Sequence, residues 1–203
     1  MTRTKLALVL VGAMPLMAAY GGWATVSVKD LPDYIVAGQS TALQFYVRQH
    51  GYNYLRGLHP TIEARSGSLG ATVEARAADD SLYSASLTLT QPGDWTITIN
   101  SGFGNSRVTL VPIQVVASAG RQPVALTDAQ RGERLFAAKG CVTCHVGFDV
   151  GPKLTGRSFD PDFLNRWLVN PQSVRPSSQM PNPNLKPAEV AALVAFLNQS
   201  RGS

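Results

Sequence analysis

The chain has 203 residues, of which 44% are hydrophobic and 15% are charged. These proportions are typical of a folded protein and exclude an intrinsically disordered chain. The formal net charge is +5, but no run of Lys or Arg occurs, so we do not expect nucleic-acid binding. The positive excess lies in residues 121–203, with ten Lys and Arg against six Asp and Glu. That charge suits the orientation of an acidic protein partner.

The N-terminal segment, residues 1–24, has the layout of an export signal. Arg3 and Lys5 precede an apolar run, and Gly22 and Ala24 stand at the positions of a small-x-small cleavage site. The alternative is a retained membrane anchor, because the run approaches the ~20 residues that span a bilayer. Both alternatives place the rest of the chain outside the cytoplasm. We therefore expect a periplasmic protein, either soluble or anchored at its N-terminus.

Residues 25–117 predict strands. Thr, Val, Ile and aromatic residues alternate with polar ones, and turn residues rich in Gly, Ser, Pro and Asp separate the runs. Short strands at this spacing predict an antiparallel β-sandwich. Pro112 is expected at an edge or a bulge, since it has no N–H to donate. The predicted strands cover residues 25–28, 41–47, 61–65, 71–76, 81–90, 94–99 and 106–116.

After a linker at residues 118–125, the pattern becomes helical over residues 126–203. Thr127 and Gln130 predict a capping box that opens the first helix, and Gly140 is expected to end it. A second helix is predicted over residues 160–171, closed by an Asn-Pro pair. The third is predicted over residues 186–199, with Pro187 in its first turn.

Both cysteines of the chain lie in CVTCH, where Cys141 and Cys144 are followed directly by His145. A disulfide between them would close a very small loop and stabilise little. A thioredoxin-type pair belongs in a βαβ setting, which this helical context lacks, and zinc would need two further ligands. C-x-x-C-H is also the signature of covalent haem attachment, and we favour this interpretation.

Haem attachment accounts for the spacing. The two thiols add to the two vinyl groups at one edge of the porphyrin, and His145 then lies under the iron as an axial ligand. The second ligand follows by elimination: the other three methionines lie in residues 1–24, which leaves Met180 in the loop SVRPSSQMPNP. The alternative for Met180 is an ordinary surface or gap-filling side chain. We therefore expect one haem c, with His145 and Met180 as its iron ligands.

A helix with Gly132 and Phe136, then CVTCH, GPKL, RPSSQMP and a helix ending in AFL follow one another in residues 126–200. This order resembles class I cytochrome c domains, which implies an all-α haem domain. The resemblance also implies that the first helix crosses the last, so that Phe136 packs on Phe196. The stretch between His145 and Met180 is short for this family, which implies a more exposed haem edge and a less securely held methionine.

The same resemblance assigns further residues to the surroundings of the haem. The carbonyl of Pro152 would accept a hydrogen bond from the proximal imidazole and fix its tautomer. Trp167 and Arg175 would donate to the haem propionates. The alternative for these last two is a half-buried aromatic side chain and a solvated arginine.

The first domain more weakly resembles an immunoglobulin-like family of exported bacterial proteins, through AGQSTALQFYVRQHG and LTQPGDWTITI around Trp95. That resemblance implies a fold and hardly a function, so a docking or spacer role is the default. His50 and His59 invite a copper site or a distal haem ligand, but we expect His50 in a turn at the end of a strand and His59 in a loop before Pro60. Tyr46, Tyr52 and Tyr54, with Leu55, are candidates for a partner surface, and core packing is the alternative for Tyr46.

No set of nucleophile, base and orienting residue surrounds CVTCH, so we expect a non-enzyme with no catalytic residues. The expected function is single-electron transfer between redox partners in a respiratory or photosynthetic chain. One alternative is a haem-bearing subunit of a larger membrane-associated oxidoreductase complex. The other is a gas or redox sensor, in which Met180 leaves the iron. The donor, the acceptor and the role of the sandwich are not specified by the sequence.

Overall fold

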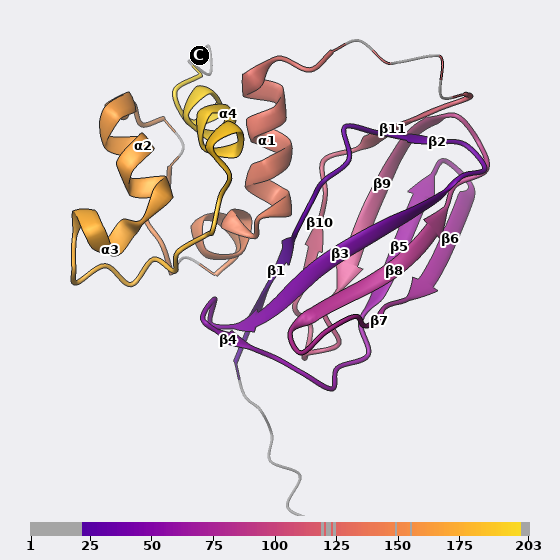
Figure 1. The fold of residues 1–203 in the computed structure, drawn as a ribbon, viewed down its shortest axis with the longest axis horizontal. Helices are drawn as coiled ribbons and strands as arrows, with labels where there is room; N and C mark the ends of the chain where they lie inside the picture. Colours follow the sequence, from indigo (N-terminus) through magenta and orange to yellow (C-terminus); the bar gives the residue numbers. More distant parts are fainter. Residues whose placement is uncertain are drawn as a thin grey trace, which may run out of the picture.

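A computed structural model of the chain describes residues 22–118, 120, 123, 125–148, 150–154 and 156–199. Its strands precede its helices along the chain, and the helices lie to one side of the sheets (Figure 1). The predicted signal peptide or anchor comprises residues 1–24. Of these, residues 1–21 lie outside the described residues. Within the described ranges, no helix is long and apolar enough to cross a membrane.

The strands form two sheets. The first comprises β1 (Ala24–Val28), β3 (Ser40–Gln49), β4 (Asn53–Tyr54), β7 (Arg76–Ala77) and β8 (Leu82–Thr88). Its order is β1-β3-β8-β7, with β4 beside β3. The second comprises β2 (Tyr34–Val36), β5 (Thr61–Ser66), β6 (Leu69–Glu74), β9 (Gly93–Asn100), β10 (Arg107–Thr109) and β11 (Ile113–Val116). Its order is β2-β11-β9-β5-β6, with β10 beside β9.

Side chains of both sheets meet in one core. In β3, Leu43, Phe45 and Val47 are fully buried while the residues between them are more exposed, as the two-residue period of a strand requires. They belong to the same apolar cluster as Ile62 of β5 and Ile97 of β9. The predicted β-sandwich, followed by a helical domain, is therefore confirmed.

The structure departs from the predicted strands in several places. β2 and β4 were not predicted, and β2 pairs with β11 in parallel, so the second sheet is not purely antiparallel. The strand predicted over residues 71–76 is divided between β6 of the second sheet and β7 of the first. The strand predicted over residues 106–116 is divided into β10 and β11, which both pair with β9. Pro112 lies in the interruption between them, because it cannot donate a ladder hydrogen bond.

Within the described residues, four α-helices follow the strands: α1 (Asp128–Ala138), α2 (Pro161–Val169), α3 (Pro171–Val174) and α4 (Pro187–Leu197). A short π-helical turn, Thr143–Gly147, lies between α1 and α2. The capping box of Thr127 and Gln130 opens α1 as predicted, and Pro187 occupies the first turn of α4. The short helix α3 was not predicted. Pro171 does end the preceding helix, but it also begins α3, since a proline is tolerated in the first turn of a helix.

Helices α1 and α4 cross at Gly132. A Cβ atom at this position would lie 2.0 Å from the carbonyl oxygen of Ala192, so only glycine allows the two helices to approach so closely. Near the crossing, the rings of Phe136 and Phe196 pack with centroids 5.6 Å apart. The predicted contact between the first and last helices is therefore confirmed.

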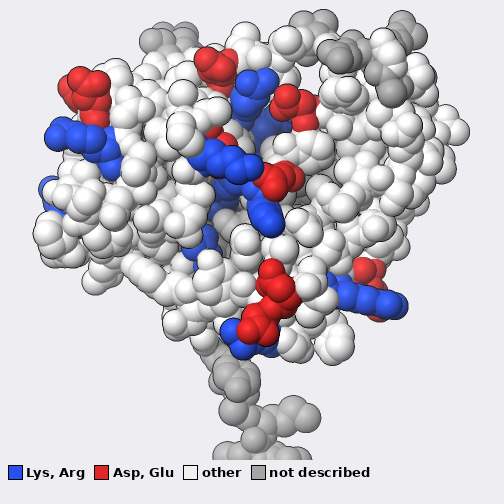
Figure 2. Space-filling view, in the orientation of Figure 1, with Lys and Arg blue, Asp and Glu red and all other residues white. Residues whose placement is uncertain are grey.

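The helical domain is packed directly on the sandwich. Ala138, at the end of α1, belongs to the sandwich core, and Val142 packs against it. The Ser27 hydroxyl of β1 donates to the carbonyl of Lys139 at 3.0 Å, and buried Arg134 donates to the carbonyl of Asp33 at 2.8 Å. Figure 2 shows charged side chains gathered in the middle of this face, over the junction of helices and strands.

Candidate metal centre

The cysteine segment begins where α1 ends. Gly140 stops the helix with φ +79°, and a Cβ atom there would lie 2.8 Å from the carbonyl oxygen of Val26 in β1. Cys141 follows at once, and Cys144 and His145 lie on a short π-helical turn, Thr143–Gly147. The structure thus brings both thiols and the imidazole together on one turn, pressed against the first strand of the sandwich.

Both cysteines are free thiols and partly buried. Burial raises the pKa of Cys141 to about 12, and it also raises the pKa of Cys144. Both thiols are therefore protonated at neutral pH, which disfavours a redox-active pair that depends on a thiolate. In the part of the chain that the structure describes, no group of three or more His, Cys, Asp or Glu side chains could hold a metal ion.

His145 is held by its own loop. Its Nδ1 lies 2.8 Å from the carbonyl oxygen of Pro152, the hydrogen bond that the family resemblance implies. Nδ1 is thus the protonated nitrogen, and Nε2 remains available as a ligand atom. A Cβ atom at Gly151 would lie 2.7 Å from the imidazole, so this glycine lets the loop close over the ring.

A pocket of about 260 Å³ opens beside His145. It lies between α1, the end of α4 and the segment 154–158, and its apolar lining includes Phe136, Leu154 and Phe196, while Arg157 stands at its polar side. The ring of Phe136 lies 6.4 Å from the imidazole. Two thiols and one available imidazole nitrogen on neighbouring turns, beside a pocket lined in part by Phe136 and Phe196, fit a covalently attached haem, although neither cysteine lines the pocket itself.

Met180 lies on a different segment, the loop between α3 and α4. Its sulfur accepts a hydrogen bond from Nε1 of Trp167 in α2 at 3.0 Å, and its side chain packs against the apolar cluster of the helical domain. Its carbonyl accepts from Nε2 of Gln172 at 2.7 Å. Met180 does not line the pocket of His145, but Phe136 borders both the pocket and this cluster.

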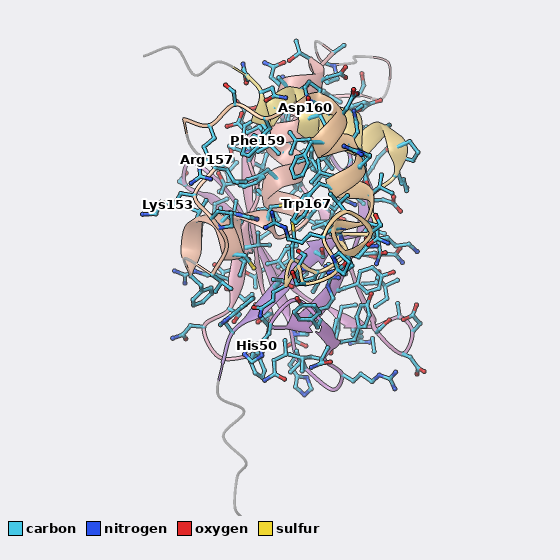
Figure 3. All side chains as sticks on the ribbon, turned by 90° about the vertical axis from the view of Figure 1, so that its left-hand side faces the viewer. His50, Lys153, Arg157, Phe159, Asp160 and Trp167 are labelled. Carbon is cyan, nitrogen blue, oxygen red and sulfur yellow. The ribbon has the colours of Figure 1, made fainter. Side chains whose placement is uncertain are left out.

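The remaining predicted residues are placed as follows. Trp167 is half-buried, stacked on Phe163 at 5.5 Å, with its N–H turned to the Met180 sulfur; Figure 3 shows it on the helical domain. Arg175 is exposed, directly after α3. His50 and His59 are also exposed, and His50 lies in a turn of the sandwich as predicted (Figure 3).

Three partners of the Met180 loop were not predicted. The hydroxyl of Tyr52 in the sandwich donates to the carbonyl of Gln179, and Gln172 and Trp167 hold Met180 from the helical side. The sequence signal for Trp167 was its resemblance to a position that donates to haem propionates. Nothing in the sequence pattern indicates the contact of Tyr52, because it joins residues far apart along the chain.

A helix, a Cys-x-x-Cys-His turn, a histidine fixed through Nδ1 and a closing helix that crosses the first define a class I cytochrome c-like domain. Residues 127–197 match the family model described as cytochrome C oxidase, cbb3-type, subunit III. This match supports a haem-bearing electron-transfer domain in residues 127–197. No curated protein matches the chain.

Solved structures resemble the sandwich half. They include domains 4 and 5 of the S-layer protein SbsC (20% identity, 46% of this chain and 51% of that chain, TM-score 0.34) and the CARDB domain of the Pyrococcus furiosus protein PF1109 (18%, 46% and 87%, TM-score 0.28). The PKD domain of human SorCS2 also matches, with 11% identity over 59% of this chain and 95% of that chain and a TM-score of 0.28. The chain spans only about a fifth of two longer matches, 17% and 20% of their lengths. Such likeness carries no inference about function.

Proposed function

We propose that this protein is an exported monohaem c-type cytochrome that passes single electrons between redox proteins. The observation that carries the proposal is the hydrogen bond between Nδ1 of His145, the histidine of CVTCH, and the carbonyl of Pro152, next to a pocket lined in part by Phe136 and Phe196. This bond orients the imidazole and leaves Nε2 to bind iron, the arrangement expected of a haem-ligating histidine.

Each residue of the site has a distinct role in this proposal. In the haem-loaded protein, Cys141 and Cys144 would hold the haem through thioether bonds, and His145 and Met180 would be its iron ligands. A thioether ligand favours the reduced state and raises the reduction potential. The bound haem supplies an iron that accepts and releases one electron.

Neighbouring residues limit the access of water to the site and adjust the electron density at the Met180 sulfur. Phe136 and Phe196 exclude water from the histidine side. Trp167 donates to the Met180 sulfur, which limits the electron density that the thioether offers to iron. Arg175 is exposed and available to a propionate. The protein works in the periplasm, where the export signal at residues 1–24 would deliver it.

The direct test is an optical spectrum of the protein matured in a host that attaches haem, with and without carbon monoxide in the ferrous state. Covalent haem, a weak far-red ferric band of methionine–iron bonding and no response to carbon monoxide support the proposal. Met180→Ala is expected to keep the haem and to bind carbon monoxide. Rapid binding by the wild type would instead favour a sensor.

A second candidate is a haem-bearing subunit of a larger oxidoreductase complex. It is favoured by the matched family, whose description names an oxidase subunit, and by the sandwich, whose exposed Tyr54 and Leu69 offer apolar contact area. Isolation from native membranes under mild detergent separates the two candidates. A stable stoichiometric complex supports the subunit, and a freely eluting protein supports the carrier.

A further inference from the structure

The turn between β3 and β4 has a tightly determined shape. His50 and Gly51 both adopt positive φ, 51° and 82°, in a connection of three residues between the paired Gln49 and Asn53. The N–H of Tyr52 donates to the carbonyl of Gln49 at 3.0 Å, and the N–H of His50 donates to Trp23 at 3.1 Å. The turn therefore projects from the sandwich as a fixed structure.

The tip of this turn contacts both neighbours of Met180. The hydroxyl of Tyr52 donates to the carbonyl of Gln179, the residue before the methionine. Gly51 lies against Pro181, the residue after it, so closely that a Cβ atom on Gly51 would lie 2.7 Å from the Pro181 ring. Figure 1 shows β4 at the end of the sandwich that faces the helices.

The same end of the sandwich also reaches the histidine side. The ring of Trp23 stacks on Phe148 with centroids 5.4 Å apart, and it meets the His50 ring edge-on at 5.3 Å. Phe148 closes the π-helical turn that carries His145. While residues 22–24 remain in the chain, this end of the sandwich thus contacts the segments of both proposed iron ligands. Cleavage after Ala24 would remove Trp23 and leave the contacts of Tyr52 and Gly51 with the Met180 loop.

The Met180 loop needs such support. Residues 175–186 contain no helix or strand, and segments of this kind open locally at low cost in free energy. Within the helical domain, Met180 accepts hydrogen bonds from Trp167 and Gln172, and its own N–H donates to the Ser178 hydroxyl. Tyr52 adds a hydrogen bond to this loop from the sandwich.

We propose that the β3–β4 turn of the sandwich is a positioning element for Met180, which keeps the thioether on the iron and external ligands out. The proposal rests on the function proposed above. The sandwich then has a role within this chain, because it supports the loop that carries Met180. This loop ends the stretch between His145 and Met180 that is short for class I cytochrome c domains. Tyr52 is a positioning residue, since it acts on Met180 only through the backbone of Gln179.

The test measures imidazole binding to the ferric form of the full-length haem protein, together with the far-red methionine band. Tyr52→Phe removes the hydroxyl and keeps the ring, so it is expected to raise imidazole affinity roughly two- to tenfold, the worth of one hydrogen bond. Tyr54→Phe is the matched control, because Tyr54 lies in the same hairpin but packs on Tyr46. It is expected to leave the affinity unchanged.

A second pair of variants tests the Gly51 contact. Gly51→Ala is expected to push Pro181 away and to raise imidazole affinity. Gly38→Ala is its control, since Gly38 also has positive φ (+75°) but no atom within 4 Å of the added Cβ. Gly38→Ala therefore measures the effect of backbone strain at a turn glycine with positive φ, without a clash with a neighbouring side chain.

The experiment distinguishes failure of the positioning role of the turn from failure of the proposed function. If the wild type shows covalent haem and the methionine band while Tyr52→Phe binds imidazole as the wild type does, the positioning role is refuted and the proposed function remains. An equal rise in Tyr52→Phe and Tyr54→Phe also refutes it, since the effect would then be general loosening. A wild type without the methionine band refutes the proposed function, and the positioning role with it.

Discussion

Lys139, at the end of α1, and Glu189, in the first turn of α4, form an ion pair of 2.8 Å whose side chains are only 6% and 14% exposed. The ammonium group also donates to the carbonyl of Lys29 in the sandwich at 2.9 Å. One buried cation therefore joins both helices of the crossing to the β domain. It holds together the parts of the molecule that the proposed haem site needs.

Glu189→Gln is expected to lower the free energy of unfolding by about 3 kcal/mol, because it leaves a buried ammonium without a counter-charge. The double variant Lys139→Met/Glu189→Gln should recover part of this loss, since neither charge is then left alone. Chemical denaturation monitored by circular dichroism measures both. A loss below about 0.5 kcal/mol would mean that water reaches the pair and screens it as at a surface.

Asp30 and Lys186 form a second, exposed ion pair across the same junction. The hydrogen bond from Lys186 holds the pKa of Asp30 below its usual 3.8. A depressed carboxyl pKa stabilises the folded state above the unfolded pKa, and this contribution is lost as the pH falls through the folded value. Asp30→Asn is thus expected to be slightly less stable than the wild type at pH 6 and equal to it well below pH 3.8.

The control for that pH dependence is Asp80→Asn. Asp80 pairs with Arg56 at 3.8 Å within the sandwich, and both side chains are largely exposed. Melting temperatures recorded across the acid range should show no comparable convergence for this variant. A constant difference between Asp30→Asn and the wild type at every pH would contradict the assigned pair.

Gly132→Ala is expected to be strongly destabilising, by about 3 kcal/mol or more, because overpacking a tight contact displaces backbone. The added Cβ would lie 2.0 Å from the Ala192 carbonyl and 2.6 Å from Cβ of Phe196. Gly120→Ala is the control, since nothing lies within 4 Å of a Cβ there. Thermal unfolding and the yield of covalent haem are the readouts; a fully stable, haem-loaded variant would refute the close crossing.

Trp167→Phe is expected to lower the reduction potential of the haem protein. It keeps an aromatic ring but removes the N–H that donates to the Met180 sulfur at 3.0 Å, so the thioether becomes a better donor to ferric iron. One hydrogen bond corresponds to roughly 20–60 mV for a single electron. Redox titration measures the shift.

Phe163→Leu is the control for Trp167→Phe. It alters the ring on which Trp167 stacks at 5.5 Å and leaves the donating N–H in place. Its potential should stay close to that of the wild type. If the two variants shift the potential equally, the effect comes from packing and not from the hydrogen bond.

Several features could be predicted from the sequence because they depend on residues that are close together in the chain. The capping box at Thr127, the stop at Gly140 and the C-x-x-C-H turn depend on residues a few positions apart, so their geometry is local. The alternation that buries Phe45 and Ile97 likewise follows from the two-residue period of a strand. The family resemblance added the bond between His145 and Pro152, which lies within one loop.

Only the tertiary structure decided the rest, because those features join segments that are distant in the chain. No periodic sequence pattern predicts these features. They are the parallel pairing of β2 with β11, the hydrogen bond from Trp167 to the Met180 sulfur and the hydrogen bond from Tyr52 to Gln179. The sequence alone determined that residues 141–145 carry a C-x-x-C-H motif and that strands precede helices. The packing of the two domains determined which end of the sandwich supports the methionine loop, because a contact of this kind exists only once both domains are folded.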